Sequence, residues 1–332
     1  MRRFKGRAGP ADRSPEIPAP RIFAHGLTGP RPVTDEIPSA AEILALSPEE
    51  VDRLLDRLER TVPVRPGFVD LPQRDFPEAI VFGDTHGDWR STAEVERRFF
   101  DATGGPRCLV GLGDYVDRPP GDCPNGSVVN ALRLLSLAGR YPDRVFLIQG
   151  NHETSRRIPV LPHSLAEEVD DLWGPVEERY TRLVALLERG PLAAASASGV
   201  YFAHAGFPRG SLPASWRRAF EEPDDSRLID LVWSDPDATR HQHGADRPWT
   251  EAELLGFLGR AQESAFVRGH DPDLTGRPLY GGRCLTLHTT RIYERYGGVI
   301  VARVPLGSPV GNVVDLRVEH LGTEGQRFDS GD

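Results

Sequence analysis

Five short apolar runs, each followed by a glycine-flanked group of polar residues, constrain the fold of this sequence most strongly. The runs are AIVF (79–82), CLVGL (108–112), VFLI (145–148), VYFA (200–203) and AFV (265–267). They are too short for helices and are punctuated by glycine, so they predict buried strands. Open α/β sheets gather their ligands at the carboxyl ends of the strands, and we therefore expect the five polar groups to meet at one site.

The polar groups contain the side chains of a metal centre. Asp84 and His86 follow the first run, and the later runs deliver Asp114, Asp117, Asn151, His152, His204 and His270. Carboxylate oxygens and imidazole nitrogens together suit divalent ions such as Mn, Fe or Zn. One Asp-x-His pair is more typical of a cap or a surface hydrogen bond. Its recurrence at five strand ends favours one shared site over five unrelated loops.

The order of these motifs resembles a known family. GDTHGD (83–88), GDYVDR (113–118), GNHE (150–153), HAG (204–206) and RGH (268–270) are similar to the signature set of the calcineurin-like metallophosphoesterases. More narrowly, they resemble the phosphoprotein phosphatase branch of Ser/Thr protein phosphatases. The resemblance implies an α/β fold, a four-layer β-sandwich of two sheets flanked by helices. It also implies two divalent metal ions, with Mn expected first and Fe, Zn or Co as alternatives.

The resemblance further implies a role for each matched residue. The implied metal ligands are Asp84 and His86 for the first ion, Asp114 as the bridge, and Asn151, His204 and His270 for the second. His152 would be the general acid that protonates the leaving alkoxide, with Asp117 behind it. The implied phosphate-binding residues are Arg118, Arg247, Tyr293 and Asn151, with Tyr296 as the alternative to Tyr293. The implied reaction is direct in-line hydrolysis of a phosphomonoester by a metal-activated water.

Three functions compete for this site. A protein Ser/Thr phosphatase, with phosphotyrosine as a further substrate, is favoured by the segment LVWSDPD (231–237), which resembles the protein-directed branch. The alternative is a hydrolase of nucleotides or of diadenosine tetraphosphate on the same metal core. A pseudoenzyme that only binds ligands is disfavoured, because all six implied metal positions carry a competent side chain. Pro119 stands where the family has glycine, which predicts a different path for the loop after Arg118.

Composition excludes several other classes of protein. A net charge of −9 argues against non-specific nucleic-acid binding, and the absence of a long apolar run argues against a membrane span. We therefore expect a cytoplasmic protein. The resemblance implies a phosphoprotein or phosphopeptide as its partner. Cys108, Cys123 and Cys284 are too scattered for a disulfide framework, and none precedes an arginine at the spacing of a tyrosine-phosphatase nucleophile. A single lysine among many arginines predicts a GC-rich, bacterial genome.

The sequence divides into four segments. We expect a disordered Pro/Arg-rich arm over 1–39, a helical extension over 40–76, the catalytic domain over 77–321 and a flexible tail over 322–332. Amphipathic segments at 91–100, 127–137 and 165–187 predict helices between the strands. Runs at 231–233, 283–288, 298–304 and 313–321 predict a second, largely antiparallel sheet. His163, His288 and His320 show no ligand-like setting, and His241 and His243 fit a solvated loop.

Overall fold

The computed structural model describes residues 37–101, 103, 105–175, 177–210, 215–238 and 247–322. The predicted arm, apart from its last three residues, and nearly all of the predicted tail lie outside the described residues, as do His241 and His243. None of the helices in the described ranges combines the length and the apolar character that a bilayer-spanning segment requires.

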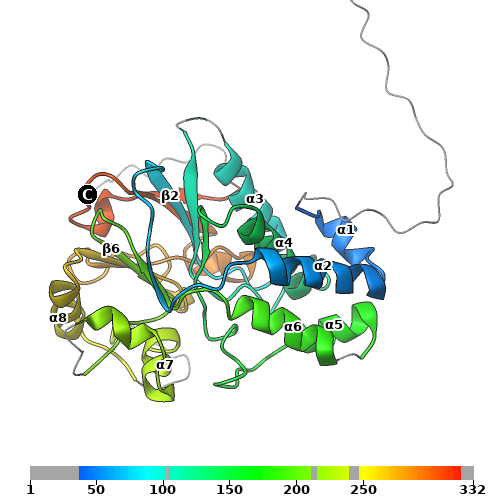
Figure 1. Ribbon diagram of the computed structural model, residues 1–332. Coiled ribbons are helices and arrows are strands. Elements are labelled where there is room, and N and C mark those ends of the chain that lie inside the picture. The colour runs from blue at the N-terminus through cyan, green and yellow to red at the C-terminus, as the bar shows by residue number, and fades with distance from the viewer. Residues whose placement is uncertain are drawn as a thin grey trace, which may run out of the picture. The chain divides into compact units, whose positions relative to one another are not determined.

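The described strands form two five-stranded sheets that pack face to face (Figure 1). The first sheet has the order β10 (Arg317–His320), β9 (Ile300–Pro305), β2 (Glu78–Phe82), β3 (Arg107–Gly111) and β4 (Val145–Leu147). The second has the order β1 (Phe68–Asp70), β5 (Ala193–Ala195), β6 (Val200–Ala203), β7 (Ala265–Arg268) and β8 (Cys284–Thr286). The five apolar runs thus correspond to strands, as the sequence predicts.

Each sheet contains three neighbouring parallel strands. β2, β3 and β4 run parallel in the first sheet, and β6, β7 and β8 run parallel in the second. The remaining pairings are antiparallel, except that of β1 with β5. The carboxyl ends of three strands in each sheet therefore lie along one edge, which is where ligands gather in sheets of this kind.

The expected second, largely antiparallel sheet is wrong in three respects. The run at 298–304 forms β9, which pairs with β2 in the sheet of the first three motifs. The run at 231–233 ends the helix α7 (Asp225–Val232), because its leucine and valine pack on a helical face. The run at 283–288 forms β8, which is parallel to β7 with Val267 opposite Leu285. Both sheets are consequently mixed.

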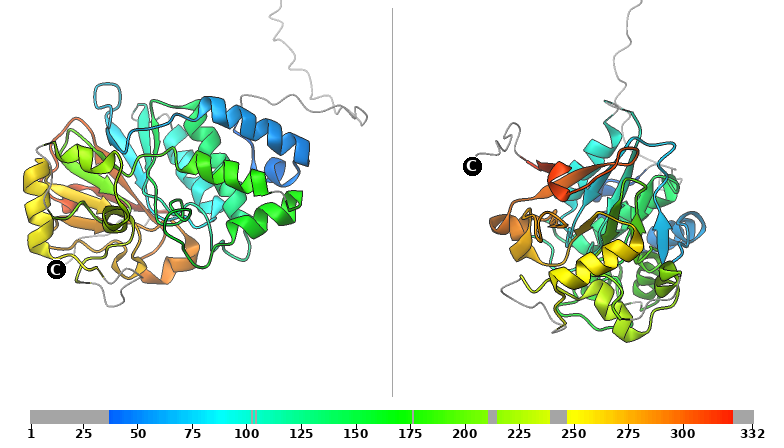
Figure 2. Two further views of the ribbon diagram at one scale, coloured as in Figure 1. Left: turned by 60° about the horizontal axis from the view of Figure 1, so that its bottom comes forward. Right: turned by 90° about the vertical axis from the view of Figure 1, so that its left-hand side faces the viewer.

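Helices cover the outer faces of both sheets, which gives four layers (Figures 1 and 2). On the outer face of the first sheet lie α3 (Trp89–Phe100) and α4 (Gly126–Arg140), while α1 (Ala40–Leu44), α2 (Pro48–Thr61), α5 (Leu165–Trp173) and α6 (Glu177–Leu187) pack on α4. The second is covered by η1 (Trp216–Phe220), α7 and α8 (Glu251–Ala261). Short 3-10 turns η2 (Pro272–Leu274), η3 (Arg291–Tyr296) and η4 (Val313–Asp315) connect the last strands.

Successive side chains of a strand pack into different layers. In β2, Ile80 and Phe82 pack against the helices, while Ala79 and Val81 pack between the two sheets. A strand presents successive side chains to opposite faces, so an apolar run without polar residues indicates burial on both sides. The helical segment expected over 165–187 divides into α5 and α6 near Gly174, whose φ of 81° a helix cannot accommodate.

Helix α2 packs on the helices α4 and α6 through an amphipathic stripe. Ser47 caps its first turn in a capping box with Glu50, and Pro48 occupies the first helical position. The stripe consists of Val51, Leu54, Leu55 and Leu58, all buried in the cluster that contains α4 and α6. The following strand β1 pairs with β5. The segment expected as an extension thus contributes both a helix and a strand to the fold.

Leu55→Ala should lower the free energy of unfolding by about 2 to 5 kcal/mol, because it removes a side chain that is 1% exposed and leaves a cavity. Leu255→Ala in α8 is the matched control. Leu255 is 43% exposed, so a change below about 0.5 kcal/mol is expected. Urea unfolding of the two variants beside the wild type measures both values, and equal small effects would contradict a core role for α2.

Candidate metal centre

Six acceptor side chains converge between the two sheets at the carboxyl ends of five strands. They are Asp84 after β2, Asp114 after β3, Asn151 after β4, His204 after β6 and His270 after β7, with His86 two residues beyond Asp84. All six are buried. The convergence follows from the parallel strands described above, since each of them delivers its polar residue to the same edge.

His86 lies between the two carboxylates. Its Nε2 is 3.9 Å from Asp84 Oδ2 and 3.8 Å from Asp114 Oδ2. Its Nδ1 is 3.1 Å from the carbonyl oxygen of Val116, which can only accept, so Nδ1 carries the proton and Nε2 presents its lone pair to the carboxylates. Burial, reinforced by His152, lowers the pKa of His86 to about 3. A neutral imidazole held in this tautomer is what a metal ligand requires.

His204 occupies the equivalent place in the other half of the site. Its Nε2 is 2.9 Å from Asn151 Oδ1, 3.2 Å from His270 Nδ1 and 3.4 Å from Asp114 Oδ1. Its Nδ1 donates to the carbonyl oxygen of Leu112 at 2.9 Å, which directs the Nε2 lone pair into the site. Burial lowers the pKa of His204 to about 4, so this imidazole is also neutral at physiological pH.

The arrangement of acceptors calls for cations at its centre. The Asn151 side-chain oxygen faces only other acceptors, although a rotated amide would donate to both Asp114 oxygens at 3.0 and 3.1 Å. Burial and the charges of Asp84 and Glu153 raise the pKa of Asp114 well above its usual range. Lone pairs and carboxylates directed at one another are unfavourable unless a positive charge lies between them. This set of carboxylate, amide and imidazole side chains therefore fits divalent metal ions, with Asp114 close to both His86 and His204.

Glu153 links the loops that carry Asp114 and Asn151, a role that the sequence did not predict. Its carboxylate accepts from the backbone N–H groups of Asp114 at 2.7 Å, Tyr115 at 2.9 Å and Gly150 at 2.9 Å. Burial raises its pKa to about 7. Glu153 thus fixes the Asp114 loop to the Asn151 loop. Its position inside GNHE was the only signal available.

Backbone conformation marks the same loops independently. His86, Asp114, Asp117, Arg118 and His270 all have positive φ, between 43° and 73°. Non-glycine residues adopt this region rarely and at a cost, and such residues concentrate at functional sites. The loop after Arg118 continues into Pro119, whose own φ is fixed near −65°, so the positive φ values lie before the proline. The different loop path predicted from Pro119 is thus compatible with the placement of Asp117 and Arg118.

Asp117 holds two histidines at once. His152 Nδ1 donates to Asp117 Oδ2 at 2.5 Å, and His163 Nδ1 lies 2.9 Å from the same oxygen. Although burial opposes ionisation, the hydrogen bonds from both histidines hold the pKa of Asp117 well below its usual range. The Nε2 of His152 has no hydrogen-bond partner among the described residues and lies 3.8 Å from Asp114 Oδ2. This nitrogen lies close to Asp114, and His152 forms with His86 and Asp114 one of the groups that could hold a metal ion.

The predicted phosphate-binding residues divide into two groups. Arg118 donates to the Tyr293 hydroxyl at 3.1 Å, and the Tyr293 ring packs against His86 with centroids 5.7 Å apart, so both lie at the metal centre. Arg247 is instead bound to α7, with hydrogen bonds to Ser226 and an ion pair with Asp230 at 3.0 Å. Its role in phosphate binding stays a prediction from the sequence.

Two histidines without a ligand-like setting in the sequence lie at the site. His163 contacts Asp117, as described, and donates or accepts at the Tyr180 hydroxyl at 2.7 Å. The Nε2 of His288 lies 3.2 Å from Asp84 Oδ2. His288 thus lies beside a predicted ligand, contrary to the expectation, which considered only its neighbours in sequence. His163 contacts no predicted metal ligand through these hydrogen bonds, so the expectation for it stays a prediction.

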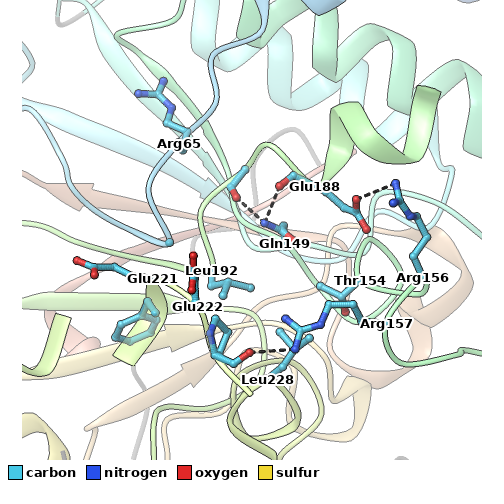
Figure 3. A pocket seen from close by; sticks show the side chains of 14 residues that line it. Arg65, Gln149, Thr154, Arg156, Arg157, Glu188, Leu192, Glu221, Glu222 and Leu228 are labelled. Atoms are coloured by element: carbon cyan, nitrogen blue, oxygen red, sulfur yellow. Dashed lines mark hydrogen bonds and ion pairs between the residues drawn. The ribbon is translucent and has the colours of Figure 1, made fainter. Parts of the chain in front are cut away.

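A separate polar pocket lies beside the loop that follows the GNHE motif (Figure 3). Among its lining residues, Arg156 pairs with Glu188 at 3.1 Å, and Arg157 pairs with Asp225 at 2.7 Å. None of the six converging side chains lines this pocket. Both arginines are thus paired with carboxylates, and a third arginine of the lining, Arg65, donates to the backbone carbonyl oxygens of Pro142 and Val145.

Gly269→Ala should reduce the metal content of the protein. A Cβ atom at this position would lie 2.2 Å from Asp84 Oδ1, so the carboxylate would have to move away from the site. Gly259→Ala in α8 is the matched control, because a Cβ there meets nothing within 4 Å. Elemental analysis after equilibration with Mn²⁺ measures the bound metal, and wild-type metal content in the Gly269→Ala protein would contradict the assignment of Asp84.

His163→Gln should destabilise the protein more at low pH than at high pH. The hydrogen bond to Asp117, opposed by burial, raises the pKa of His163 above 6.5. A raised folded-state pKa contributes stability that is present below the unfolded value and lost as pH rises through the folded value. Urea unfolding at about pH 6 and about pH 9 should show a larger effect of the substitution at the lower pH. An equal effect at both would mean that His163 is not charged in the fold.

Comparisons with known proteins agree with this geometry. Residues 79–274 match the family of calcineurin-like phosphoesterases. A PP2A-like serine/threonine-protein phosphatase of Candida albicans, PPG1, is 31% identical over 260 residues, which cover 75% of this chain and 59% of the relative. Serine/threonine-protein phosphatase 5 of Rattus norvegicus is 26% identical and covers 68% of this chain and 45% of its own length. The chain thus spans about half of the length of these relatives.

A solved structure supports the fold. A protein serine/threonine phosphatase from Saccharomyces cerevisiae superposes with a TM-score of 0.67 at 19% identity, covering 85% of this chain and 92% of that structure. The family match extends over more than half of the sequence and contains all the converging side chains from Asp84 to His270. The chain therefore belongs to the calcineurin-like phosphoesterases.

Proposed function

We propose that the chain is a dinuclear metal-dependent phosphomonoesterase that acts on phosphoserine and phosphothreonine in proteins. The observation that carries the proposal is the convergence of neutral imidazoles and carboxylates around shared Asp114, next to a histidine whose Nε2 is unpartnered in the described structure. The named relatives are serine/threonine protein phosphatases, which supports the choice of substrate class.

Two sets of residues would bind the two metal ions, with one residue in common. Asp84 and His86 would hold the first ion, Asn151, His204 and His270 the second, and the carboxylate of Asp114 both. When bound, two such ions lower the pKa of a water and neutralise charge on the phosphoryl oxygens. Mn is the expected metal, and Fe, Zn or Co suit the same donors.

His152 would supply the proton for the leaving group. Its Nδ1 is held by the Asp117 carboxylate, which orients the ring and stabilises the charge of the imidazolium. Burial lowers the pKa of His152 and Asp117 opposes that effect, so the proton on Nε2 is readily given up. A serine or threonine alkoxide is a poor leaving group, and a positioned acid contributes about 10² to 10⁴ in rate for such a group.

Arg118 would bind the phosphoryl oxygens. Its guanidinium lies beside Tyr293 over the metal centre, and a planar guanidinium can hold two such oxygens at once. Asn151 and Tyr293 would assist it, and Arg247 would join it by leaving its contacts with α7. The LVWSDPD segment contributes Trp233, which packs on His270 with centroids 5.6 Å apart, and Asp235, which pairs with buried Arg268 at 2.9 Å. A cytoplasmic location remains a prediction from the sequence.

His152→Asn should retain the metal ions and lose activity on a poor leaving group. We expect a fall of about 10² to 10⁴ in kcat on a phosphothreonine peptide and a much smaller fall on p-nitrophenyl phosphate, whose leaving group needs no proton. Asp114→Asn is the contrasting variant and should lose metal and activity on both substrates. Unchanged turnover of the phosphopeptide by His152→Asn would refute the general-acid assignment.

The substrate class is tested by comparing a phosphothreonine peptide with diadenosine tetraphosphate. The metal-stripped protein is assayed with and without added Mn²⁺ on each substrate. Peptide hydrolysis restored by Mn²⁺ is the expected result. Turnover of the dinucleotide alone would keep the metal centre but transfer the function to nucleotide metabolism.

A further inference from the structure

His288 is a buried imidazole beside Asp84 that the implied ligand set leaves out. It lies just beyond β8, and the backbone N–H of the next residue, Thr289, donates to the carbonyl oxygen of Asp84 at 2.9 Å. The His288 side chain is 0% exposed. Its Nε2 lies 3.2 Å from Asp84 Oδ2, yet this nitrogen has no hydrogen-bond partner of acceptable geometry in the described structure.

The contact of His288 Nδ1 with the Thr275 hydroxyl favours one tautomer of the ring. The Thr275 hydroxyl donates its one proton to the carbonyl oxygen of Pro272 at 2.8 Å and lies 3.1 Å from His288 Nδ1. With that proton on the Pro272 oxygen, the Thr275 oxygen accepts from Nδ1–H. In the neutral ring Nε2 then carries a lone pair, which is directed at a carboxylate oxygen. Metal-bound histidines are commonly oriented by a hydrogen bond of this kind on the other ring nitrogen.

The distance fits two ligands of one ion. Atoms that bind a divalent ion at about 2.1 Å lie roughly 3.0 to 3.4 Å apart in octahedral or tetrahedral geometry. The separation of 3.2 Å between His288 Nε2 and Asp84 Oδ2 falls within this range. The Tyr293 ring packs edge-on against both His288 and His86, with centroids 5.5 and 5.7 Å apart. The two imidazoles therefore share a contact with the same aromatic ring.

We infer that His288 is a further ligand of the ion held by Asp84 and His86. The inference rests on the metal centre of the proposed function and adds a residue to it. Each half of the centre then has two imidazoles: His86 and His288 in one half, and His204 and His270 in the other. A second nitrogen in the first half shifts its preference toward Fe, Zn or Co and away from Mg, which prefers oxygen.

The competing explanation is a structural hydrogen bond. In that case His288 is an imidazolium that donates from Nε2 to Asp84, and it never contacts the ion. Both explanations allow His288→Gln to weaken metal binding, because residues behind a ligand also affect affinity. A measurement that reports direct bonding is therefore needed.

Co²⁺ supplies that measurement in the full chain. A ring N–H proton of a histidine bound to paramagnetic Co²⁺ gives a strongly shifted, exchangeable NMR signal, whereas a histidine outside the coordination sphere does not. We expect His288→Gln to lack one such signal that the wild type shows. One of the two Co²⁺ equivalents should also bind at least about tenfold more weakly, and the other should be unchanged. The unchanged second equivalent and the circular dichroism spectrum establish that the variant is folded.

His320→Gln is the matched control, because it removes an imidazole from the edge strand β10 and should keep every shifted signal. The same set of signals in His288→Gln and wild type would overturn the inference in favour of the structural hydrogen bond. No binding of Co²⁺ by the wild type would overturn both this inference and the proposed metal centre. Normal Co²⁺ binding in a protein without phosphatase activity would refute the proposed function alone.

Discussion

Mutual repulsion between buried acceptors is the constraint on which the site depends. Asp84 and Asp114 stand within 4 Å of the same imidazole nitrogen, and both carboxylates are almost completely buried. Without a positive charge between them, this arrangement raises the pKa of Asp114 and leaves several lone pairs opposed. Backbone strain at His86, Asp114 and His270 adds to the cost. Bound cations would offset these costs, so metal binding and the stability of these loops are expected to be coupled.

The two sheets provide the frame that holds the acceptors in place. Three parallel strands in each sheet end at a common edge, and the apolar layer between the sheets fixes one edge against the other. Glu153 then joins the loops after β3 and β4 through three backbone hydrogen bonds. His152, the proposed general acid, is held instead by the shared carboxylate of Asp117, which lies outside the acceptor cluster. The proposed proton donor and the candidate metal ligands are therefore held in place by different residues.

What the sequence could predict follows from one rule, that polar functional residues gather at the carboxyl ends of strands. Applied to five runs, it identified the strands β2, β3, β4, β6 and β7 and the polar residues that follow them. The same rule would have found His288, because RCLTLH is another short run that ends in polar residues. It failed there because strand direction is not visible in a sequence, and β8 was assigned to an antiparallel sheet. The helical LVW segment failed for a related reason, since three apolar residues fit a strand and a helix end equally well.

Contacts between distant loops were beyond the reach of sequence reasoning. His163 meets Asp117 across 46 positions, and no local motif announces it. Arg247 shows a different case, because only a loosely matching segment predicted its role, and its guanidinium pairs with Asp230 in this structure. Side-chain direction depends on the packing of neighbouring elements, and the segment just before Arg247 lies outside the described residues.

The most direct test of the account is the position of bound metal in a crystal grown with Mn²⁺. Anomalous difference density should show two peaks about 3.5 to 4 Å apart, with the Asp114 carboxylate between them and Asp84 and His204 on opposite sides. A single peak, or density away from Asp114, would contradict the central claim that this carboxylate joins two metal sites.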